Sequence, residues 1–521
     1  MKKIKYLIIV LSISLSFFGC DKRLEQQNPN LQTSVQYWKT AADASAGVVA
    51  IYNSMIQDGS YQRMFPALTD GRGDDFKGDS PWGDLVQVAN FTIPTTSGPV
   101  QWVWAQHYQW VYRTNQVLTY VPDITMDEAL KKRLLGQAYF LRALAYFNLA
   151  RTYKQVPLII SLPKDQAEYY PPTATEDELW NQIFADFQKA AEMLPVNYNS
   201  VSGADQGQVG RATKGAAVGL LGKAYLYRQK WQEAANQFKL IIDGPELNVY
   251  SLVPDFRDNF KPTNENNTES LFEIQFADPS TVGGTVGNYG GEPNANWKQV
   301  NSIGHTYAME GFGYSDFLPT RWIYDEFKKE KTVDGNLDPR LLATIASYEP
   351  GVSELAYFGP WNNPKTNIYP RKYTHDGIPG FVNENNGIEN SGINYRVLRF
   401  SDVLLMYAEA LNELGQTASA YPYIQRVRNR AKLPDLATTK PGMSQADMRE
   451  QLAHERALEF AIEAQRINDI IRWGWLYNAG KLAELKTHDS DFNTWAPGNE
   501  YLPIPQTELD VNKNLKPNPA N

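Results

Sequence analysis

Acidic side chains gather in one loop-like stretch, where two carboxylates could hydrolyse a glycosidic bond or bind sugar hydroxyl groups. The stretch contains Asp70, Asp74, Asp75, Asp79 and Asp84. A glycosidase holds its two carboxyl groups about 5–5.5 Å or about 6.5–9.5 Å apart, according to its mechanism. Spacing along a loop fixes no such distance, and acidic loop residues more often cap turns or accept hydrogen bonds. We therefore expect a binding protein and no enzyme.

Metal chemistry has little support in the sequence. His454 and Glu455 resemble the start of a zinc-protease motif, but position 458, where the motif needs its second histidine, is Leu458. The other histidines show no ligand spacing, and no complete calcium loop of the Asp-x-Asn-x-Asp-Gly type is present. We expect no cofactor, and a structural calcium ion in the acidic and Asn-rich loops stays open.

Aromatic residues are frequent, with 13 Trp and 30 Tyr in the chain. Trp82, Trp297 and Trp361 lie in loop sequences rich in Pro, Gly or Asn, which give them no helical face. A ring in such a loop can stack on the C–H face of a sugar, because its faces are apolar and its tip is polar. The alternative for each ring is packing under its own loop. We predict that these three tryptophans are ligand platforms, and that they favour sugars over peptides.

Further ligand contacts are expected from neighbouring loops, because binding residues concentrate on loops that a scaffold holds in place. The additional platform candidates are Tyr289, Tyr307, Tyr314 and Tyr395. The candidate polar contacts are Arg72, Asp74, Asp75, Asn296, Arg371 and Asn394. Stacking on one or two rings with a few exposed hydrogen bonds predicts weak binding, about micromolar or poorer.

Charged residues near the C-terminus recur three or four positions apart, which places several of them on neighbouring helical faces. They are Glu455, Arg456, Glu459, Arg466 and Asp469. We interpret them as a structural ion-pair network rather than a functional site. The same interpretation applies to Arg399, Asp402, Arg428 and Arg430.

The N-terminus is typical of an exported lipoprotein. A basic segment (residues 2–5) precedes an apolar stretch (residues 7–18). About a dozen apolar residues are too few to cross a bilayer, which takes about 20, but they suit a signal peptide. Gly19 and Cys20 then resemble a bacterial lipobox, in which the cysteine is acylated, for example with palmitate, and the chain is cut before it.

Cys20 is the only cysteine, so within an exported chain it has no disulfide partner. We expect residues 1–19 to be a signal peptide and residues 20–33 to be a lipidated polar tether. The alternative is an ordinary signal peptide that contains a cysteine. The net charge of -8 argues against nucleic acid as a partner.

Apolar spacing predicts helices over residues 36–55, 102–121, 126–153 and 176–194. Residues 211–243 and 404–431 each predict a helix pair, in which small residues such as Gly222 and Ala224 allow close approach. These pairs resemble tetratricopeptide units. A final long helix is predicted over residues 444–473.

Residues 243–399 lack most of this periodicity and are rich in Gly, Pro, Asn and aromatics. Loops of this length are usually functional or disordered, and the aromatics argue against disorder. We therefore predict a mainly α fold in one interlocked unit (residues 34–521). A tetratricopeptide-like scaffold (mainly 34–243 and 400–475) carries a large irregular, ligand-binding part (mainly 60–100 and 244–399). An extended, strand-like tail at 501–505 ends the fold.

Several short segments follow one another in a recognisable order. They include Arg142-Ala143-x2-Tyr146-Phe147, Gly222-Lys223-Ala224-Tyr225-Leu226, Arg399-Phe400-Ser401-Asp402, Val427-Arg428-Asn429-Arg430-Ala431, Arg472-Trp473-Gly474 and Tyr501-Leu502-Pro503-Ile504-Pro505. With the lipoprotein-like start, they resemble the SusD/RagB family of Bacteroidetes outer-membrane lipoproteins.

The resemblance implies a protein anchored by lipid to the outer membrane and facing the cell exterior. Such proteins hold an oligosaccharide, or in some relatives a peptide, for a SusC-like TonB-dependent transporter, and do no chemistry on it. It also implies that the helical repeats face the transporter and the irregular part carries the ligand. Two alternatives remain: a binder of peptides or another nutrient, and a structural transporter subunit without a ligand.

Overall fold

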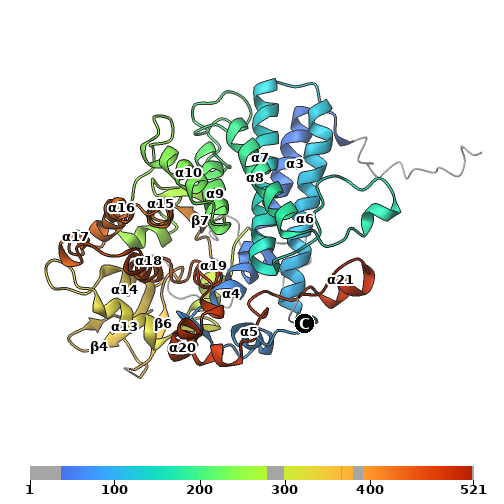
Figure 1. Ribbon diagram of the computed structural model, residues 1–521. Helices are drawn as coiled ribbons and strands as arrows, with labels where there is room; N and C mark the ends of the chain where they lie inside the picture. The colour runs from blue at the N-terminus through green and yellow to red at the C-terminus, as the bar shows by residue number, and fades with distance from the viewer. Residues whose placement is uncertain (1–36, 278–298, 365, 379–390, 519–521) are drawn as a thin grey trace, which may run out of the picture.

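The computed structural model describes residues 37–277, 299–364, 366–378 and 391–518. Long helices open the described chain: α3 (Ala41–Met55), α6 (Gly98–Tyr120), α7 (Glu128–Tyr153) and α8 (Glu176–Met193). They pack side by side (Figure 1). The four predicted helices are therefore confirmed. α3 begins later than predicted because Thr40 forms a capping box with Asp43.

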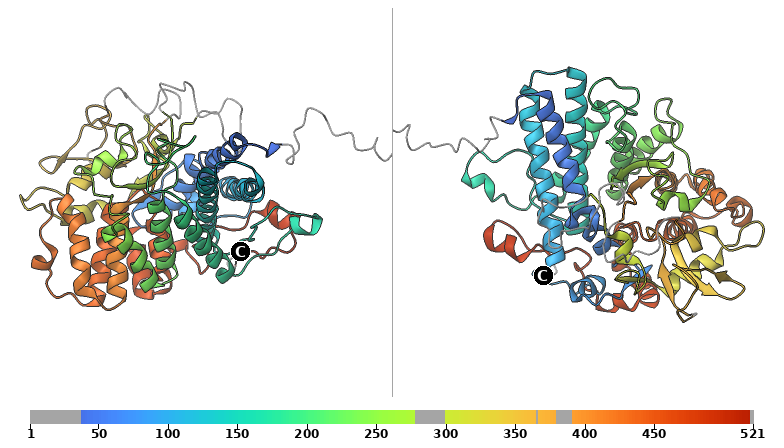
Figure 2. Two further views of the ribbon diagram at one scale, coloured as in Figure 1. Left: turned by 90° about the horizontal axis from the view of Figure 1, so that it is seen from above. Right: turned by 180° about the vertical axis from the view of Figure 1, so that it is seen from behind.

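Two helix pairs continue this array, as predicted. α9 (Lys214–Tyr227) and α10 (Trp231–Asp243) pack beside α15 (Phe400–Glu413) and α16 (Thr417–Arg430), the green and orange helices of Figure 2. A Cβ atom on Gly222 would lie 2.6 Å from a ring carbon of Phe238 in the paired helix. The absence of a side chain at Gly222 therefore allows α9 and α10 to approach closely.

The single helix predicted over residues 444–473 is wrong, because the chain turns in its middle. α18 (Gln445–Phe460) and α19 (Arg466–Arg472) are separate helices. Between them, Ile462 and Ala464 adopt left-handed backbone, with φ of 62° and 52°. The Ala464 N–H donates to Asp70 Oδ1 at 2.6 Å, and this buried bond holds the turn.

The part expected to be irregular contains many short elements. Its helices are η2 (Asp58–Gln62, a π-helical turn), α4 (Met64–Asp70), α5 (Gly83–Ala89), η5 (Phe256–Phe260), α12 (Ile303–Tyr307), α13 (Arg321–Lys329) and α14 (Pro339–Thr344). Its strands are β1 (Phe76–Gly78), β2 (Ser270–Ile274), β3 (Phe317–Pro319), β4 (Ile345–Glu349), β5 (Ser353–Glu354), β6 (Ile368–Pro370) and β7 (Tyr395–Arg399). Within the described ranges they form the antiparallel sheets β1-β3, β2-β7 and β5-β4-β6. Elements this short show no periodicity in sequence.

The C-terminal part returns to the first helices. Its remaining elements are α17 (Leu436–Thr439), η6 (Trp475–Tyr477), α20 (Ala479–His488), η7 (Ser490–Thr494) and α21 (Gln506–Val511). The tail at 501–505 is extended but forms no strand, and the Leu502 N–H donates to Thr152 O at 2.8 Å. One apolar core runs from Ala44 to Ile504. This shared core confirms a single interlocked unit.

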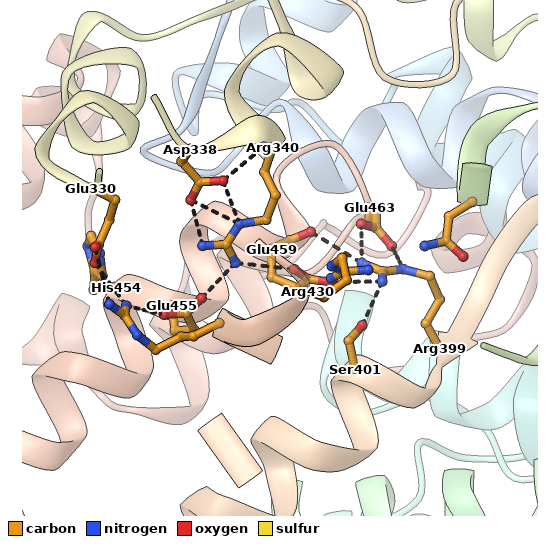
Figure 3. Close-up of polar contacts among 12 residues, drawn as sticks. Glu330, Asp338, Arg340, Arg399, Ser401, Arg430, His454, Glu455, Glu459 and Glu463 are labelled. Carbon is orange, nitrogen blue, oxygen red and sulfur yellow. Dashed lines mark hydrogen bonds and ion pairs between the residues drawn. The ribbon is translucent and has the colours of Figure 1, made fainter. Parts of the chain in front are cut away.

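A layer of buried charges joins α14 and β7 to α18, as Figure 3 shows. Arg399 contacts Glu463 at 2.7 Å, Glu269 at 2.5 Å and Glu459 at 2.9 Å. Arg340 binds Glu455 at 2.6 Å, and both side chains are fully buried. The ion-pair interpretation of these residues is therefore confirmed. The network fastens the irregular part to the helical scaffold.

No helix in the described part of the chain combines the length and the apolar character needed to cross a bilayer. Over the same residues, no group of three or more His, Cys, Asp or Glu side chains is arranged to hold a metal ion.

Candidate functional site

Trp82 and Tyr314 lie at adjacent ends of the small β1-β3 sheet. Gly78 at the end of β1 pairs with Phe317 at the start of β3. The Asp79 N–H extends this pairing by donating to Asp316 O at 2.9 Å. Trp82 follows β1 closely and Tyr314 precedes β3 closely, so the sheet brings two residues from distant parts of the chain to one place.

Arg63 lies between the two rings. Its guanidinium carbon is 5.8 Å from the centre of the Trp82 ring and 5.0 Å from the centre of the Tyr314 ring. Arg63 Nη2 donates to Asp316 Oδ2 at 2.9 Å, which fixes the cation in this position. Such contacts with aromatic faces are worth about 0.5–2 kcal/mol each.

Hydrogen bonds also hold Trp82 itself. Its indole Nε1 donates to Asp84 Oδ2 at 2.8 Å, and its backbone N–H donates to Ser80 Oγ at 3.0 Å. Ser80 Oγ donates in turn to Asp316 Oδ1 at 2.5 Å. The ring is half-buried and lies 5.8 Å from Trp102 of α6. Asp316 therefore positions both the Arg63 guanidinium and the loop that carries Trp82.

Tyr314 completes this surface, which we call the Trp82–Tyr314 site (Arg63, Trp82, Trp102, Tyr314 and Asp316). Its side chain is 38% exposed. Its ring packs edge-on against His305 at 4.3 Å. The rings of Trp82 and Tyr314 can stack on a ligand, whereas Arg63 and Asp316, at 5% and 2% exposed, hold these rings in place from beneath.

Trp361 belongs to a different cluster. It packs with Tyr348, Tyr357 and Tyr369, with ring centres 6.0–6.5 Å apart, above the buried Met309. Its indole nitrogen is buried and has no hydrogen-bond partner among the residues that the structure describes. Trp361 is half-buried, as Trp82 is, so its role as a ligand platform stays a prediction.

The predicted polar contacts Arg72, Asp74 and Asp75 are at most 2% exposed, so they are unavailable to a ligand in this structure. Arg72 Nη1 donates to Glu500 O at 2.6 Å. Asp74 binds Arg466 at 2.5 Å and His488 at 2.8 Å. Burial opposes ionisation of Asp74, but Arg466 and His488 outweigh it and lower its pKa to about 2.

The pKa of Asp75 shifts in the opposite direction, because burial and the charge of the adjacent Asp74 raise it well above the ordinary value.

Arg371 Nε donates to Asp376 Oδ2 at 2.6 Å and its Nη1 to Leu342 O at 2.6 Å. These bonds tie the loop of Arg371 to α14, and because the side chain keeps 17% exposure its ligand contact stays a prediction.

The remaining described candidates are in the core. Tyr395 is 3% exposed and stacks on Tyr373 at 5.4 Å, so it is a core residue and not a platform. Tyr307 donates to Asp70 Oδ2 at 2.7 Å. Asn394 is fully buried and bonds to β2 and the residues beside it. Cys20, Tyr289, Asn296 and Trp297 lie outside the described residues.

Arg63, Trp102 and Asp316 were missed by the sequence interpretation. Trp102 was read only as part of a predicted helix. Arg63 lies between a π-helical turn and a short helix, and has no periodic or motif signal. Only the pairing of β1 with β3 reveals that it lies between two rings.

Residues 268–520 match the SusD family, and residues 24–226 match a family described as starch-binding and associating with the outer membrane. The SusD-like protein P2 of Formosa agariphila is 30% identical over 532 residues, which cover 99% of each chain. The chain belongs to the SusD family. Another relative, the SusD-like protein P25 of the same organism, is 26% identical and covers 98% of this chain and 97% of its own.

Solved SusD structures have the same fold. A SusD superfamily protein from Bacteroides vulgatus superposes with a TM-score of 0.80 at 28% identity, over 93% of this chain and 100% of its own. A laminarin-binding SusD-like protein superposes with a TM-score of 0.75 at 28% identity, over the same shares. In this SusD-family chain, Arg63 and Trp82 lie in the segment 24–226, and Tyr314 lies in the segment 268–520. The Trp82–Tyr314 site is therefore assembled from both.

Proposed function

We propose that this SusD-family chain is a cell-surface lipoprotein that captures oligosaccharide or polysaccharide without chemical change. The observation that carries the proposal is the pair of aromatic rings, Trp82 and Tyr314, fixed around Arg63. Aromatic faces held in fixed positions match the C–H faces of a sugar. The laminarin-binding relative with the same fold adds support for a sugar ligand.

Binding without catalysis is supported by the surroundings of the acidic residues. Asp70, Asp74 and Asp75 are buried, at no more than 4% exposed. Asp84 accepts the indole hydrogen of Trp82. A glycosidase would need two carboxylates free to reach one glycosidic bond. These four side chains instead support the fold or hold the aromatic platform.

Membrane attachment and delivery complete the proposal. Lipid on Cys20 anchors the chain to the outer membrane, and residues 20–33 act as the tether. The captured glycan passes to a SusC-like TonB-dependent transporter. A match to a family described as associating with the outer membrane supports this placement. Weak binding suits the role, because the ligand must be released.

Electrophoresis through gels that contain laminarin, starch, fructan, xylan or mannan tests the proposal. At least one polysaccharide should retard the wild type, and Trp82→Ala should lose most of that retardation. Trp82→Phe keeps a ring but not the bond to Asp84, so it should keep part of it. Calorimetry with peptides covers the alternative ligand class.

Two results would overturn the proposal. If no glycan retards the wild type but peptides bind to it, the ligand is a peptide. A folded Trp82→Ala variant with wild-type retardation would remove the site assignment.

A further inference from the structure

A cavity lies away from the Trp82–Tyr314 site, between α6 and the arm that connects α7 with α8. We call residues 157–173 the arm; it projects beside α6 and α21 (Figure 1). The cavity has a volume of about 610 Å³. Its walls include Tyr108, Val111 and Tyr112 of α6 and Ile160, Tyr169 and Tyr170 of the arm.

Buried side chains fix the base of the arm. Tyr146 Oη donates to Ile159 O at 2.9 Å and accepts the Ile159 N–H at 2.6 Å. Asn115 Nδ2 also donates to Ile159 O, at 2.9 Å, and Arg142 Nη1 donates to Ile160 O at 2.9 Å. Tyr108 Oη donates to Pro157 O at 2.7 Å. Side chains of α6 and α7 therefore hold residues 157–160, the start of the arm, in place.

The C-terminal residues fix the far end of the arm. Asn514 Nδ2 donates to Tyr170 O at 2.7 Å, and Asn512 Nδ2 donates to Pro171 O at 2.8 Å. The Lys516 N–H donates to Thr173 Oγ1 at 3.0 Å. Tyr169 and Tyr170 are thus presented from backbone that is held at both ends.

Three tyrosine rings around the cavity are unusually open to solvent. Tyr112 is 50% exposed, Tyr169 63% and Tyr170 39%. In the described part of the chain, none of the three stacks on another ring or lies under a cation. An exposed ring on a fixed backbone loses little conformational freedom when a ligand stacks on it.

We propose that this cavity, the arm cavity, is a second carbohydrate-binding site. The inference rests on the proposed function. Among the described residues, Glu168 is the only charged residue in its wall, and that carboxylate already accepts the Lys164 N–H at 2.9 Å. Phenol rings with few charges suit a neutral, polyhydroxylated ligand better than an ionic one.

α6 connects the two sites. Trp102 of this helix belongs to the Trp82–Tyr314 site, and Tyr112 lies ten residues later in the arm cavity, about 15 Å along the axis. The two sites therefore keep a fixed separation. A polysaccharide that binds both gains avidity through effective concentration, whereas a short oligosaccharide that fills one site does not.

The test compares the full mature wild type with Tyr112→Ala/Tyr169→Ala, and with Tyr169→Ala alone in case the double variant does not fold. Tyr477→Ala is the matched control, since Tyr477 is 64% exposed and lines neither site. The polysaccharide that retards the wild type is used in the gel, and its hexasaccharide in calorimetry. The double variant should lose at least fivefold in gel affinity. Its affinity for the hexasaccharide at the Trp82–Tyr314 site should change less than twofold.

If the gel retards the double variant as much as the wild type, but retards Trp82→Ala less, the second site is overturned and the proposed function stays intact. Unchanged glycan binding with loss of a co-purifying outer-membrane protein would also overturn it, because the surface would then be a protein interface. If no polysaccharide retards the wild type, the proposed function fails first.

Discussion

Arg340 of α14 and Glu459 of α18 form an ion pair, with Nη1 3.2 Å from Oε2, in which neither side chain has exposed surface. Glu459 also binds Arg399 and Arg430. Burial opposes its charge, but the three guanidinium groups hold its pKa far below the ordinary value. One carboxylate thus joins elements from four parts of the chain.

Removing that charge should destabilise the fold strongly. Glu459→Gln leaves Arg340, Arg399 and Arg430 buried with too little negative charge, so we expect the free energy of unfolding to fall by about 3–5 kcal/mol. Urea unfolding followed by circular dichroism measures it. The control is Arg449→Gln, which breaks an exposed pair with Glu413 and should cost about 0–1 kcal/mol. Equal losses would contradict the structural role of the network.

His454 should make stability depend on pH in the alkaline range. It lies between Glu326 and Glu330, at 2.7 and 2.9 Å. Burial acts to lower its pKa, but hydrogen bonds to the two glutamates outweigh burial and raise it to about 9. A pKa raised in the folded state gives stability that is complete below about pH 6.5 and is lost as pH rises through about 9.

The variant His454→Gln measures that contribution. The difference in unfolding free energy from the wild type should be greatest near pH 6, at no more than about 3 kcal/mol. It should shrink between pH 7 and 9.5. A difference that is the same at pH 6 and pH 9.5 would show that charge on His454 plays no part.

The approach of α9 to α10 predicts a strong preference for glycine at position 222. Gly222→Ala places Cβ against Phe238, so overpacking should cost about 1–3 kcal/mol. Gly83→Ala is the control, because nothing lies within 4 Å of a Cβ there. Thermal unfolding of both variants checks the prediction, which fails if the two melt together.

Arg63 should contribute to ligand affinity through its position between Trp82 and Tyr314. Arg63→Met removes the cation but keeps an unbranched side chain, so glycan affinity should fall by about 3- to 30-fold. Calorimetry gives the affinity and circular dichroism checks the fold. A folded variant with wild-type affinity would exclude Arg63 from the site.

Cys20 should decide whether the protein sediments with membranes. Metabolic labelling with an alkyne fatty acid should modify the wild type, whereas Cys20→Ser should be unlabelled and soluble. Protease added to intact cells should digest the wild type. Full protection from the protease would contradict an outward-facing anchor.

Periodicity predicted helices such as α8 because apolar residues that recur three or four positions apart, among them Ile183, Phe187 and Ala190, are buried on one face. The binding surface was harder, since Trp82 and Tyr314 are brought together by three-residue strands. The loop of Arg72 and Asp74 read as exposed because its partners are remote in sequence. Arg466 lies 392 positions after Asp74, and Glu500 lies 428 after Arg72. When the segment that buries a charged side chain is distant in sequence, the residues around that side chain do not indicate its burial.

The apolar core that runs from Ala44 to Ile504 has a consequence for biosynthesis. A ribosome that has made only α3 to α10 has produced helices whose apolar faces still await α15, α18 and the residues around Leu502. Arg399 and Glu459 likewise become neighbours only when most of the chain is complete. The first half of the polypeptide therefore cannot reach its final packing alone.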